Sequence, residues 1–154
     1  MRSLTLFRHA LPVFPHEFQG ADADRPLSKL GCKLYRQQLA ILTKLSLPID
    51  QLWVSPTLRT RQTATMLRKA CIVTSKPVIC HDIALHYDLD RTIEAISIST
   101  ITHLGLVTHE PVIGAILAHY FSSSLPIEIS IGHVCQLDLS NPGYRRLALN
   151  LPQC

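Results

Sequence analysis

The sequence predicts an α/β fold, namely a three-layer α/β/α domain with a mostly parallel sheet and an antiparallel C-terminal edge. Three observations support this prediction. Short β-like runs alternate with segments of helical periodicity along most of the chain. Several of these runs end at a polar residue, as expected of parallel strands whose carboxyl ends meet at one edge. Close to the C-terminus, two β-like runs flank an Asn-Pro-Gly turn, which predicts a hairpin.

The chain is long enough for one well-buried core. It has 154 residues, of which 47% are hydrophobic and 17% charged, and its mean hydropathy is +0.19. Two comfortable domains would need more chain, so we expect residues 1–154 to form a single domain. The formal net charge is +4, but the basic residues are scattered and no aromatic side chains alternate with them. We therefore expect no nucleic-acid partner, and a mild positive balance suits an anionic small substrate or a phosphorylated protein.

The cysteines and the apolar runs indicate the cellular compartment of the protein. The five cysteines are widely spaced and form no Cys-x-x-Cys pair, which is typical of reduced thiols in a cytoplasmic protein. The N-terminus lacks the long apolar region of a signal peptide. The longest apolar run, residues 111–121, is too short to span a bilayer. We therefore expect a cytoplasmic protein without a membrane partner, and the sequence leaves its oligomeric state open.

The first third of the chain predicts a strand, a loop and a helix. Residues 4–7 form a strand-like run, and residues 11–24, which contain Pro, Gly and Asp, predict a mobile loop over the strand end, a candidate lid. Ser28 can cap a helix that ends at Leu47-Pro48. Its apolar positions follow one another at helical spacings: Leu34, Tyr35, Leu39, Ile41, Leu42 and Leu45.

The middle of the chain repeats the strand and helix order. Residues 51–54 predict a second strand, and Ser55-Pro56 predicts an N-cap followed by proline at the first helical position. Arg59 then falls in the first turn of this helix. Residues 78–80 predict a short edge strand, and residues 91–99 a further helix. The buried face of the helix after Pro56 is marked by Thr63, Met66, Leu67 and Ala70.

The last third predicts another parallel strand and the hairpin. Residues 104–108 form an apolar strand-like run, and His109 follows it directly. Pro111 opens a helical pattern that reaches about Phe121. Residues 132–139 and 144–149 are the arms of the hairpin, with Asn141-Pro142-Gly143 as its turn.

Polar side chains suited to phosphate gather at the predicted strand ends. Arg8 and His9 follow the first strand, His109 follows a later one, and Arg59 lies where a helix begins. A helix N-terminus favours anions, and a guanidinium presents a planar fork of donors to phosphate oxygens. Each of these residues alone is more often a surface arginine or a structural histidine. Their conjunction at one sheet edge predicts a phosphate-handling site.

Four linked motifs resemble the histidine phosphatase superfamily. They are LFRHA (6–10), RPLSKLG (25–31), VSPTLRTRQTA (54–64) and GLVTHEPVIG (105–114). In order and spacing they are similar to this family from residue 3 to about residue 121, and most similar to SixA-type phosphohistidine phosphatases, which often have Ala at the position of Ala10. The resemblance implies a phosphoglycerate-mutase-like fold and a metal-independent phosphatase that needs no cofactor.

The same resemblance implies a role for each matching residue. His9 would be the nucleophile and would carry a phosphohistidine intermediate. Arg8, Arg59 and His109 would bind the phosphoryl oxygens. Arg25 would line the entrance of the pocket, and a structural ion pair is its alternative role.

The general acid is where this chain departs from the family pattern. Many members supply a Glu from a loop whose counterpart here reads Cys-His-Asp-Ile at residues 80–83. Asp82 is the first candidate for the acid and Asp88 the second. An exposed loop carboxylate and a helix cap are the alternative readings of these two residues.

Acidic and histidine side chains also cluster in this region without predicting a metal site. His81 and His86 are five residues apart, a spacing that does not place two imidazoles on one helix face as a spacing of four does. The neighbouring carboxylates are Asp82, Asp88 and Asp90. We expect no metal to bind here.

The acid also separates the candidate substrates. An alkyl phosphate expels a poor alkoxide leaving group and needs a positioned acid, whereas a phosphohistidine protonated on its far ring nitrogen departs as neutral imidazole. A displaced acid is tolerable for such a substrate, and the short chain with its SixA-like motifs implies a phosphorylated signalling protein with a phosphohistidine domain as the partner. The alternatives are a phosphatase of small phosphate esters and a non-catalytic phosphate-binding adaptor.

Overall fold

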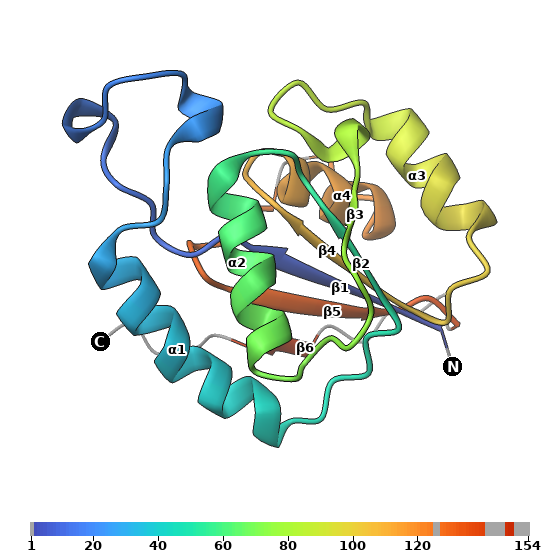
Figure 1. The fold of residues 1–154 in the computed structure, drawn as a ribbon. Helices are drawn as coiled ribbons and strands as arrows, with labels where there is room; N and C mark the ends of the chain where they lie inside the picture. The colour runs from blue at the N-terminus through green and yellow to red at the C-terminus, as the bar shows by residue number, and fades with distance from the viewer. Residues whose placement is uncertain (1, 125–126, 141–146, 150–154) are drawn as a thin grey trace.

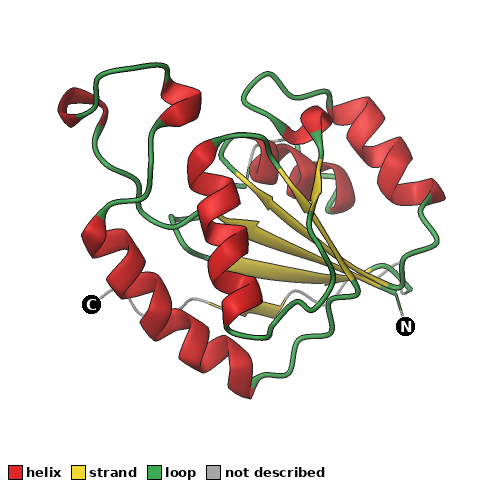
Figure 2. Cartoon of the chain, in the orientation of Figure 1, coloured by secondary structure: helices red, strands yellow, loops and turns green. Residues whose placement is uncertain are grey.

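The computed structural model describes residues 2–124, 127–140 and 147–149. Its centre is a six-stranded sheet with the strand order β3-β2-β4-β1-β5-β6 (Figures 1 and 2). The strands are β1 (Ser3–Arg8), β2 (Gln51–Val54), β3 (Val78–Ile79), β4 (His103–Thr108), β5 (Val134–Asp138) and β6 (Leu147–Leu149). The α-helices are α1 (Lys29–Lys44), α2 (Leu58–Lys69), α3 (Leu89–Ile98) and α4 (Val112–Tyr120).

The helices lie on both faces of the sheet, so the predicted α/β/α layering is confirmed (Figure 1). Phe7 of β1 packs in one buried cluster with residues of α1 and α2. Leu4 and Leu6 of the same strand pack in a second cluster with residues of α3 and α4. Because successive side chains of a strand point to opposite faces, a strand covered on both faces is buried along its length, as β1 is from Ser3 to Phe7.

The strand directions place the predicted site residues together. β1 pairs with β4, and β2 with β3 and β4, all in parallel. The register aligns Arg8 with Thr108 and Val54 with Val107. His9, Ser55 and His109 therefore follow three neighbouring strand ends at one edge of the sheet.

The C-terminal edge is antiparallel, as predicted. β5 pairs with β1 and β6 pairs with β5 in this sense. The predicted turn at residues 141–143 and the first residues of the second arm, 144–146, lie outside the described residues.

Helix α1 begins as predicted but ends earlier. The Ser28 hydroxyl accepts a hydrogen bond from the backbone N–H of Gly31 at 2.8 Å, so Ser28 is the N-cap. The last helical residue is Lys44 rather than one next to Pro48. Among the apolar positions at helical spacing, Ile41 and Leu45 are exposed, because the helix buries only one stripe.

Helix α2 starts two residues later than the Ser-Pro signal predicts. Thr57 is its N-cap, and Pro56 precedes the helix. Ser55 does not cap, because its hydroxyl bonds to His109 and its carbonyl accepts a hydrogen bond from the Thr60 hydroxyl at 2.7 Å. Arg59 still lies in the first turn, as predicted.

The remaining helices are shifted by one or two residues from their expected bounds. Asp88 caps α3 by accepting a hydrogen bond from the backbone N–H of Arg91 at 3.0 Å. Pro111 is the N-cap residue of α4 instead of its first helical residue. Within the described part of the chain, no helix combines the length and apolarity that crossing a membrane requires.

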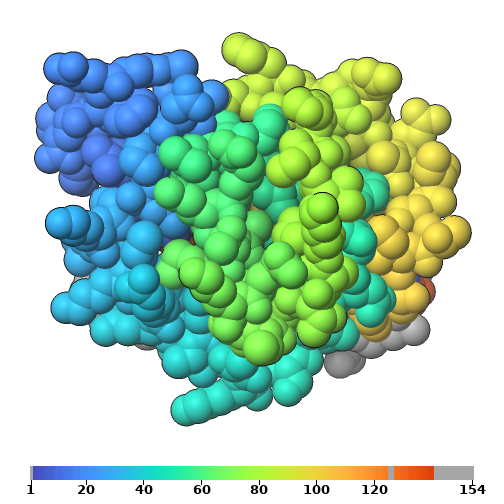
Figure 3. Space-filling model, in the orientation of Figure 1, coloured from blue at the N-terminus to red at the C-terminus, as the bar shows by residue number. Residues whose placement is uncertain are grey.

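The loop over the site carries more structure than the sequence indicates. It contains two short 3-10 turns, Pro15–Glu17 and Asp22–Asp24, and Pro12 forms an isolated bridge with Leu27. In the space-filling view this segment projects at a corner of the molecule beside α2 (Figure 3). The two ends of the loop are therefore paired with each other.

Gly31 is required where α1 meets this loop. A Cβ at this position would lie 2.0 Å from the backbone oxygen of Leu11. We expect Gly31→Ala to lower the free energy of unfolding by about 2 kcal/mol, because backbone must move to relieve the overlap. Urea unfolding measures the loss, and Lys33→Ala on the exposed side of α1 is the matched control. An unchanged midpoint for Gly31→Ala would contradict this close approach.

Candidate functional site

A pocket of about 410 Å³ opens at the carboxyl edge of the parallel strands. It brings together the expected residues Arg8, His9, Arg25, Arg59 and His109. The wall also holds two carboxylates, Asp22 and Glu110. Apolar side chains complete it: Leu11, Pro12, Phe14, Pro15, Leu85 and Ile131.

One ring nitrogen of His9 forms a hydrogen bond with the backbone, which orients the imidazole. Its Nδ1 lies 2.8 Å from the carbonyl oxygen of Ala10. Because a carbonyl can only accept, Nδ1 carries the proton and Nε2 keeps its lone pair in the neutral ring. Burial, with smaller contributions from Arg59, Arg8 and Arg25, lowers the pKa of His9 to about 4. The imidazole is therefore neutral and nucleophilic near pH 7.

The backbone on either side of His9 is held firmly. The N–H of Ala10 donates to the Thr63 hydroxyl at 3.1 Å, and that hydroxyl donates to the carbonyl of Arg59 at 2.8 Å. The carbonyl of His9 accepts from the N–H of Gly132 at 3.1 Å. A buried threonine on α2 thus links the strand end that carries His9 to the helix turn that carries Arg59.

His109 faces His9 and is positioned by Ser55. The two imidazole rings are 5.5 Å apart between centroids and meet edge to face at 63°. The Ser55 hydroxyl lies 2.7 Å from His109 Nε2. When Ser55 donates this hydrogen bond, the proton of the neutral ring resides on Nδ1 and can be donated to an oxyanion. Burial first, then His9 and Arg59, lowers the pKa of His109 to about 3.

Arg59 is buried and its guanidinium fork meets the loop. Its Nη1 donates to the carbonyl of Asp22 at 2.7 Å, and its Nη2 donates to the Asp22 carboxylate at 2.9 Å. Partial burial would raise the pKa of Asp22, but hydrogen bonds and charge from Arg25 and Arg59 lower it overall. Asp22 is therefore an anion that the arginine fork already holds.

Arg8 is held by a backbone carbonyl of the segment that precedes β5. Its Nη1 donates to the carbonyl of Ile129. Glu110 fixes that segment, because its carboxylate accepts from the N–H of Ile129 at 2.9 Å and from the N–H of Gly114 at 3.2 Å. Glu110 thus ties the start of α4 to the segment that orients Arg8.

Arg25 lines the pocket and also forms the ion pair considered for it. Its guanidinium donates to the Asp22 carboxylate from Nε and Nη2, both at 2.8 Å, and to the carbonyl of Val13 at 2.8 Å. Its side chain is 14% exposed. The sequence-based alternatives for this residue are therefore compatible with each other.

Several buried nitrogens of the pocket-lining residues have no acceptor among the described residues. Among the described residues, the buried side-chain polar atoms with no hydrogen-bond partner include Arg8 Nε, Arg59 Nε and His109 Nδ1. Buried donors are usually satisfied, and unpaired ones cost free energy. Three such donors on pocket-lining residues are suited to the several oxygens of one phosphoryl group.

The structure does not bring the candidate acids to this pocket. Asp82 lies in the 3-10 turn His81–Ile83, is absent from the pocket wall and is 4.0 Å from Arg91. Asp88 is the cap of α3. No group of three or more His, Cys, Asp or Glu side chains is placed to hold a metal ion in the described part of the chain.

Sequence reasoning missed four residues of the site: Ser55, Thr63, Asp22 and Glu110. Ser55 follows a strand end just as His9 does, and this signal was available. Asp22 is three residues before Arg25, a spacing that allows an ion pair in a turn. Glu110 and Thr63 bond to backbone groups distant in sequence, which no local pattern indicates.

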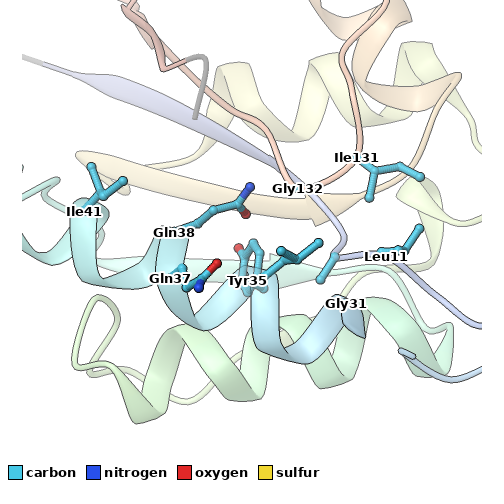
Figure 4. Close-up of a pocket in the computed structure, with 10 residues that line it drawn as sticks. Leu11, Gly31, Tyr35, Gln37, Gln38, Ile41, Ile131 and Gly132 are labelled. Atoms are coloured by element: carbon cyan, nitrogen blue, oxygen red, sulfur yellow. The ribbon is translucent and has the colours of Figure 1, made fainter. Parts of the chain in front are cut away.

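A second cavity of about 300 Å³ lies behind the strand end, between α1 and the segment of Ile131 and Gly132 (Figure 4). It shares Leu11 and Ile131 with the first pocket. The phenol oxygen of Tyr35, which lines it, is buried and has no hydrogen-bond partner among the described residues. The hydroxyl therefore loses its contact with water without compensation from these residues.

This unpaired hydroxyl predicts an unusual mutational result. We expect Tyr35→Phe to keep or raise the free energy of unfolding, by up to about 1 kcal/mol, because the change removes an unpaired polar group and keeps the ring. Tyr35→Ala, which also removes the ring, should cost about 3 to 5 kcal/mol. Urea unfolding compares the two, and a clear loss of stability in Tyr35→Phe would show that the hydroxyl has a partner.

Comparison with family models matches residues 4–81 to the histidine phosphatase superfamily (branch 1). The matched segment contains Arg8, His9, Arg25 and Arg59. Comparison with curated proteins gave no match.

Solved structures with a similar fold include several phosphatases. The protein histidine phosphatase SixA complexed with tungstate has a TM-score of 0.80 and 18% identity, covering 95% of this chain and 96% of that one. A candidate SixA phosphohistidine phosphatase from Agrobacterium tumefaciens has a TM-score of 0.80 and 19% identity, covering 98% and 99%. A mycobacterial glucosyl-3-phosphoglycerate phosphatase has a TM-score of 0.69 and 16% identity, covering 99% and 100%. At these identities the likeness shows a shared fold.

Proposed function

Because this chain belongs to the histidine phosphatase superfamily, whose phosphatases act through a histidine, we propose that it removes phosphate from phosphohistidine in a signalling protein. The observation that carries the proposal is the state of His9. Its Nδ1 proton is held by a carbonyl, which leaves Nε2 with a free lone pair in a pocket with three arginines and a second histidine. Such a neutral imidazole can attack phosphorus.

The reaction then proceeds in two displacements. Nε2 of His9 forms a bond to phosphorus while the bond to the leaving group breaks on the opposite side, which produces a phosphohistidine intermediate. Water attacks the phosphorus next, the bond to Nε2 breaks, and inorganic phosphate leaves. Each step moves a negatively charged group whose charge is spread over three oxygens.

The cationic and N–H groups of the pocket stabilise that charge. Arg8 and Arg59 supply guanidinium donors, and His109 supplies Nδ1–H once Ser55 donates to Nε2. These groups come from three separate elements that are packed in the core, so they require little rearrangement when charge develops.

The carboxylates of the pocket favour a leaving group that needs no enzymic acid. Asp22 is engaged by two arginines, and Glu110 by two backbone N–H groups. Asp82 and Asp88 lie elsewhere. An alkyl phosphate would lack a proton donor among these carboxylates, whereas the imidazole of a phosphohistidine leaves as a neutral group.

Labelling of the enzyme tests the proposed intermediate. We expect radiolabelled phosphoramidate to label the wild type with a bond that survives alkali and is lost in acid, as a phosphorus–nitrogen bond is. His9→Ala should take up no label, and His86→Ala, an exposed histidine, should be labelled normally. Label retained in His9→Ala would reject His9 as the nucleophile.

A screen of substrates tests the proposed specificity. The second candidate function is hydrolysis of small phosphate esters, favoured by the fold similarity to the mycobacterial glucosyl-3-phosphoglycerate phosphatase. A wild type that cleaves sugar phosphates but leaves a phosphohistidine domain intact would establish this candidate instead. Tight binding of phosphopeptides without release of phosphate, even from an aryl phosphate, would indicate an adaptor.

A further inference from the structure

We infer that Asp22 sets the charge of the leaving group that this pocket accepts, and that it excludes phosphate compounds with a second anionic group next to the phosphoryl group. The inference rests on the proposed function and specifies its substrate class. The preferred leaving group is neutral or cationic, as a protonated imidazole ring is.

Asp22 lies directly beside the expected phosphoryl position. Its carboxylate is 2.8 Å from Arg25 Nη2 and 2.9 Å from Arg59 Nη2. A phosphoryl group bound by the Arg59 guanidinium is therefore a near neighbour of this carboxylate. The side chain of Asp22 is 50% exposed, whereas that of Arg59 is 3% exposed, so the carboxylate lies on the solvent side of the arginine.

The direction of the reaction brings the leaving group to this side. In an in-line displacement the nucleophile and the leaving group lie on opposite sides of phosphorus. His9 is buried, at 5% exposure, so the leaving group points toward the opening of the pocket. Asp22 and Arg25 lie in the wall of that pocket, and the two ends of the loop that carries both are paired through Pro12 and Leu27.

The charges of the pocket leave room for one anionic group. The charged side chains in its wall are three arginines and two carboxylates: Arg8, Arg25, Arg59, Asp22 and Glu110. Two of the arginines share the Asp22 carboxylate. These groups leave a net charge of +1, which a phosphoryl dianion already exceeds, so a further carboxylate on the substrate would face Asp22 without a cation of its own. Like charges at this range repel, even near a protein surface.

Three small ligands of similar length isolate this effect. Phosphoethanolamine, ethyl phosphate and phosphoglycolate carry a cationic, a neutral and an anionic tail on the same phosphoryl group. Their dissociation constants are measured by calorimetry in the His9→Ala background, where no turnover is expected. We expect phosphoethanolamine to bind at least about tenfold more tightly than phosphoglycolate, from one charge interaction at an effective dielectric constant of about 20.

Removing the charge of Asp22 should reduce this preference. Asp22→Asn keeps the shape of the side chain, and we expect it to lower the ratio of the phosphoglycolate to the phosphoethanolamine dissociation constant by about tenfold. Asp24→Asn is the matched control, because Asp24 lies in the same 3-10 turn, is exposed and has no side-chain hydrogen bond or ion pair among the described residues. It should leave the ratio within about twofold.

Two results would overturn the inference. One is tighter binding of phosphoglycolate than of phosphoethanolamine with Asp22 intact, which needs no variant of this residue. The other is an equal change in all three dissociation constants in Asp22→Asn. That outcome would mean that Asp22 only competes with the phosphoryl group for the arginines and does not sense the tail of the ligand. Neither result bears on the labelling of His9 in the wild type. Failure of this inference can therefore be distinguished from failure of the proposed function.

Discussion

Arg59→Ala should lower kcat/KM by roughly a hundred- to a thousandfold, a loss of about 2.7 to 4 kcal/mol in transition-state stabilisation. Arg59 contributes a planar fork from the first turn of α2, and its side chain is only 3% exposed, so little water screens its charge. The variant also removes one of the two arginines that pair with the Asp22 carboxylate, which adds repulsion to the loss of a donor. Steady-state hydrolysis of an aryl phosphate measures the effect.

Two further variants separate charge from geometry. Arg59→Lys keeps the charge but not the fork, and we expect an intermediate loss because an ammonium cannot donate two parallel hydrogen bonds. Arg61→Ala, on the exposed side of the same helix, should retain activity within about twofold. Urea unfolding of each variant shows whether lost activity reflects lost structure. A kcat/KM within threefold of wild type for a folded Arg59→Ala would remove this residue from the phosphoryl site.

The second large effect is a loss of stability in acid. Burial lowers the pKa of His9 to about 4 and that of His109 to about 3, while an unfolded chain titrates its histidines near 6.5. Between these values the unfolded state binds protons that the folded state does not, so protonation favours unfolding as the pH falls. The free energy of unfolding is therefore unaffected by the protonation of these two histidines above about pH 6.5, and it falls progressively as the pH drops toward 4 and below.

The size of this effect follows from the difference between the pKa of a histidine in the folded state and in the unfolded state. His9 alone should reduce the free energy of unfolding by about 2 to 3 kcal/mol between pH 7 and pH 4. His9→Asn, which does not titrate, should flatten the curve by this amount, and His86→Asn, an exposed control, should leave the slope unchanged. Urea unfolding across this pH range provides the measurement. Parallel curves for wild type and His9→Asn would contradict a neutral buried imidazole.

Local signals in the sequence were sufficient where the structure obeys local rules. Ser28 caps α1 because its hydroxyl needs only the N–H of Gly31, three residues ahead. His9 and His109 lie at one edge because parallel strands align their carboxyl ends, a rule that operates on the strand pattern alone. Ser55 shows where such signals fail. Its Ser-Pro pair predicts a helix cap, but the histidine across the site takes its hydroxyl instead.

The sequence by itself determined the α/β layering and the four side chains that surround the expected phosphoryl group, because apolar periodicity and strand ends are encoded residue by residue. Only the tertiary structure decided which carboxylates enter the pocket. Asp22 reaches Arg59 across 37 residues, and Glu110 reaches Ile129 across 19, while Asp82 and Asp88 stay outside. Such pairings depend on where loops return after the core has packed, because a buried guanidinium such as that of Arg59 needs acceptors that segments distant in sequence supply.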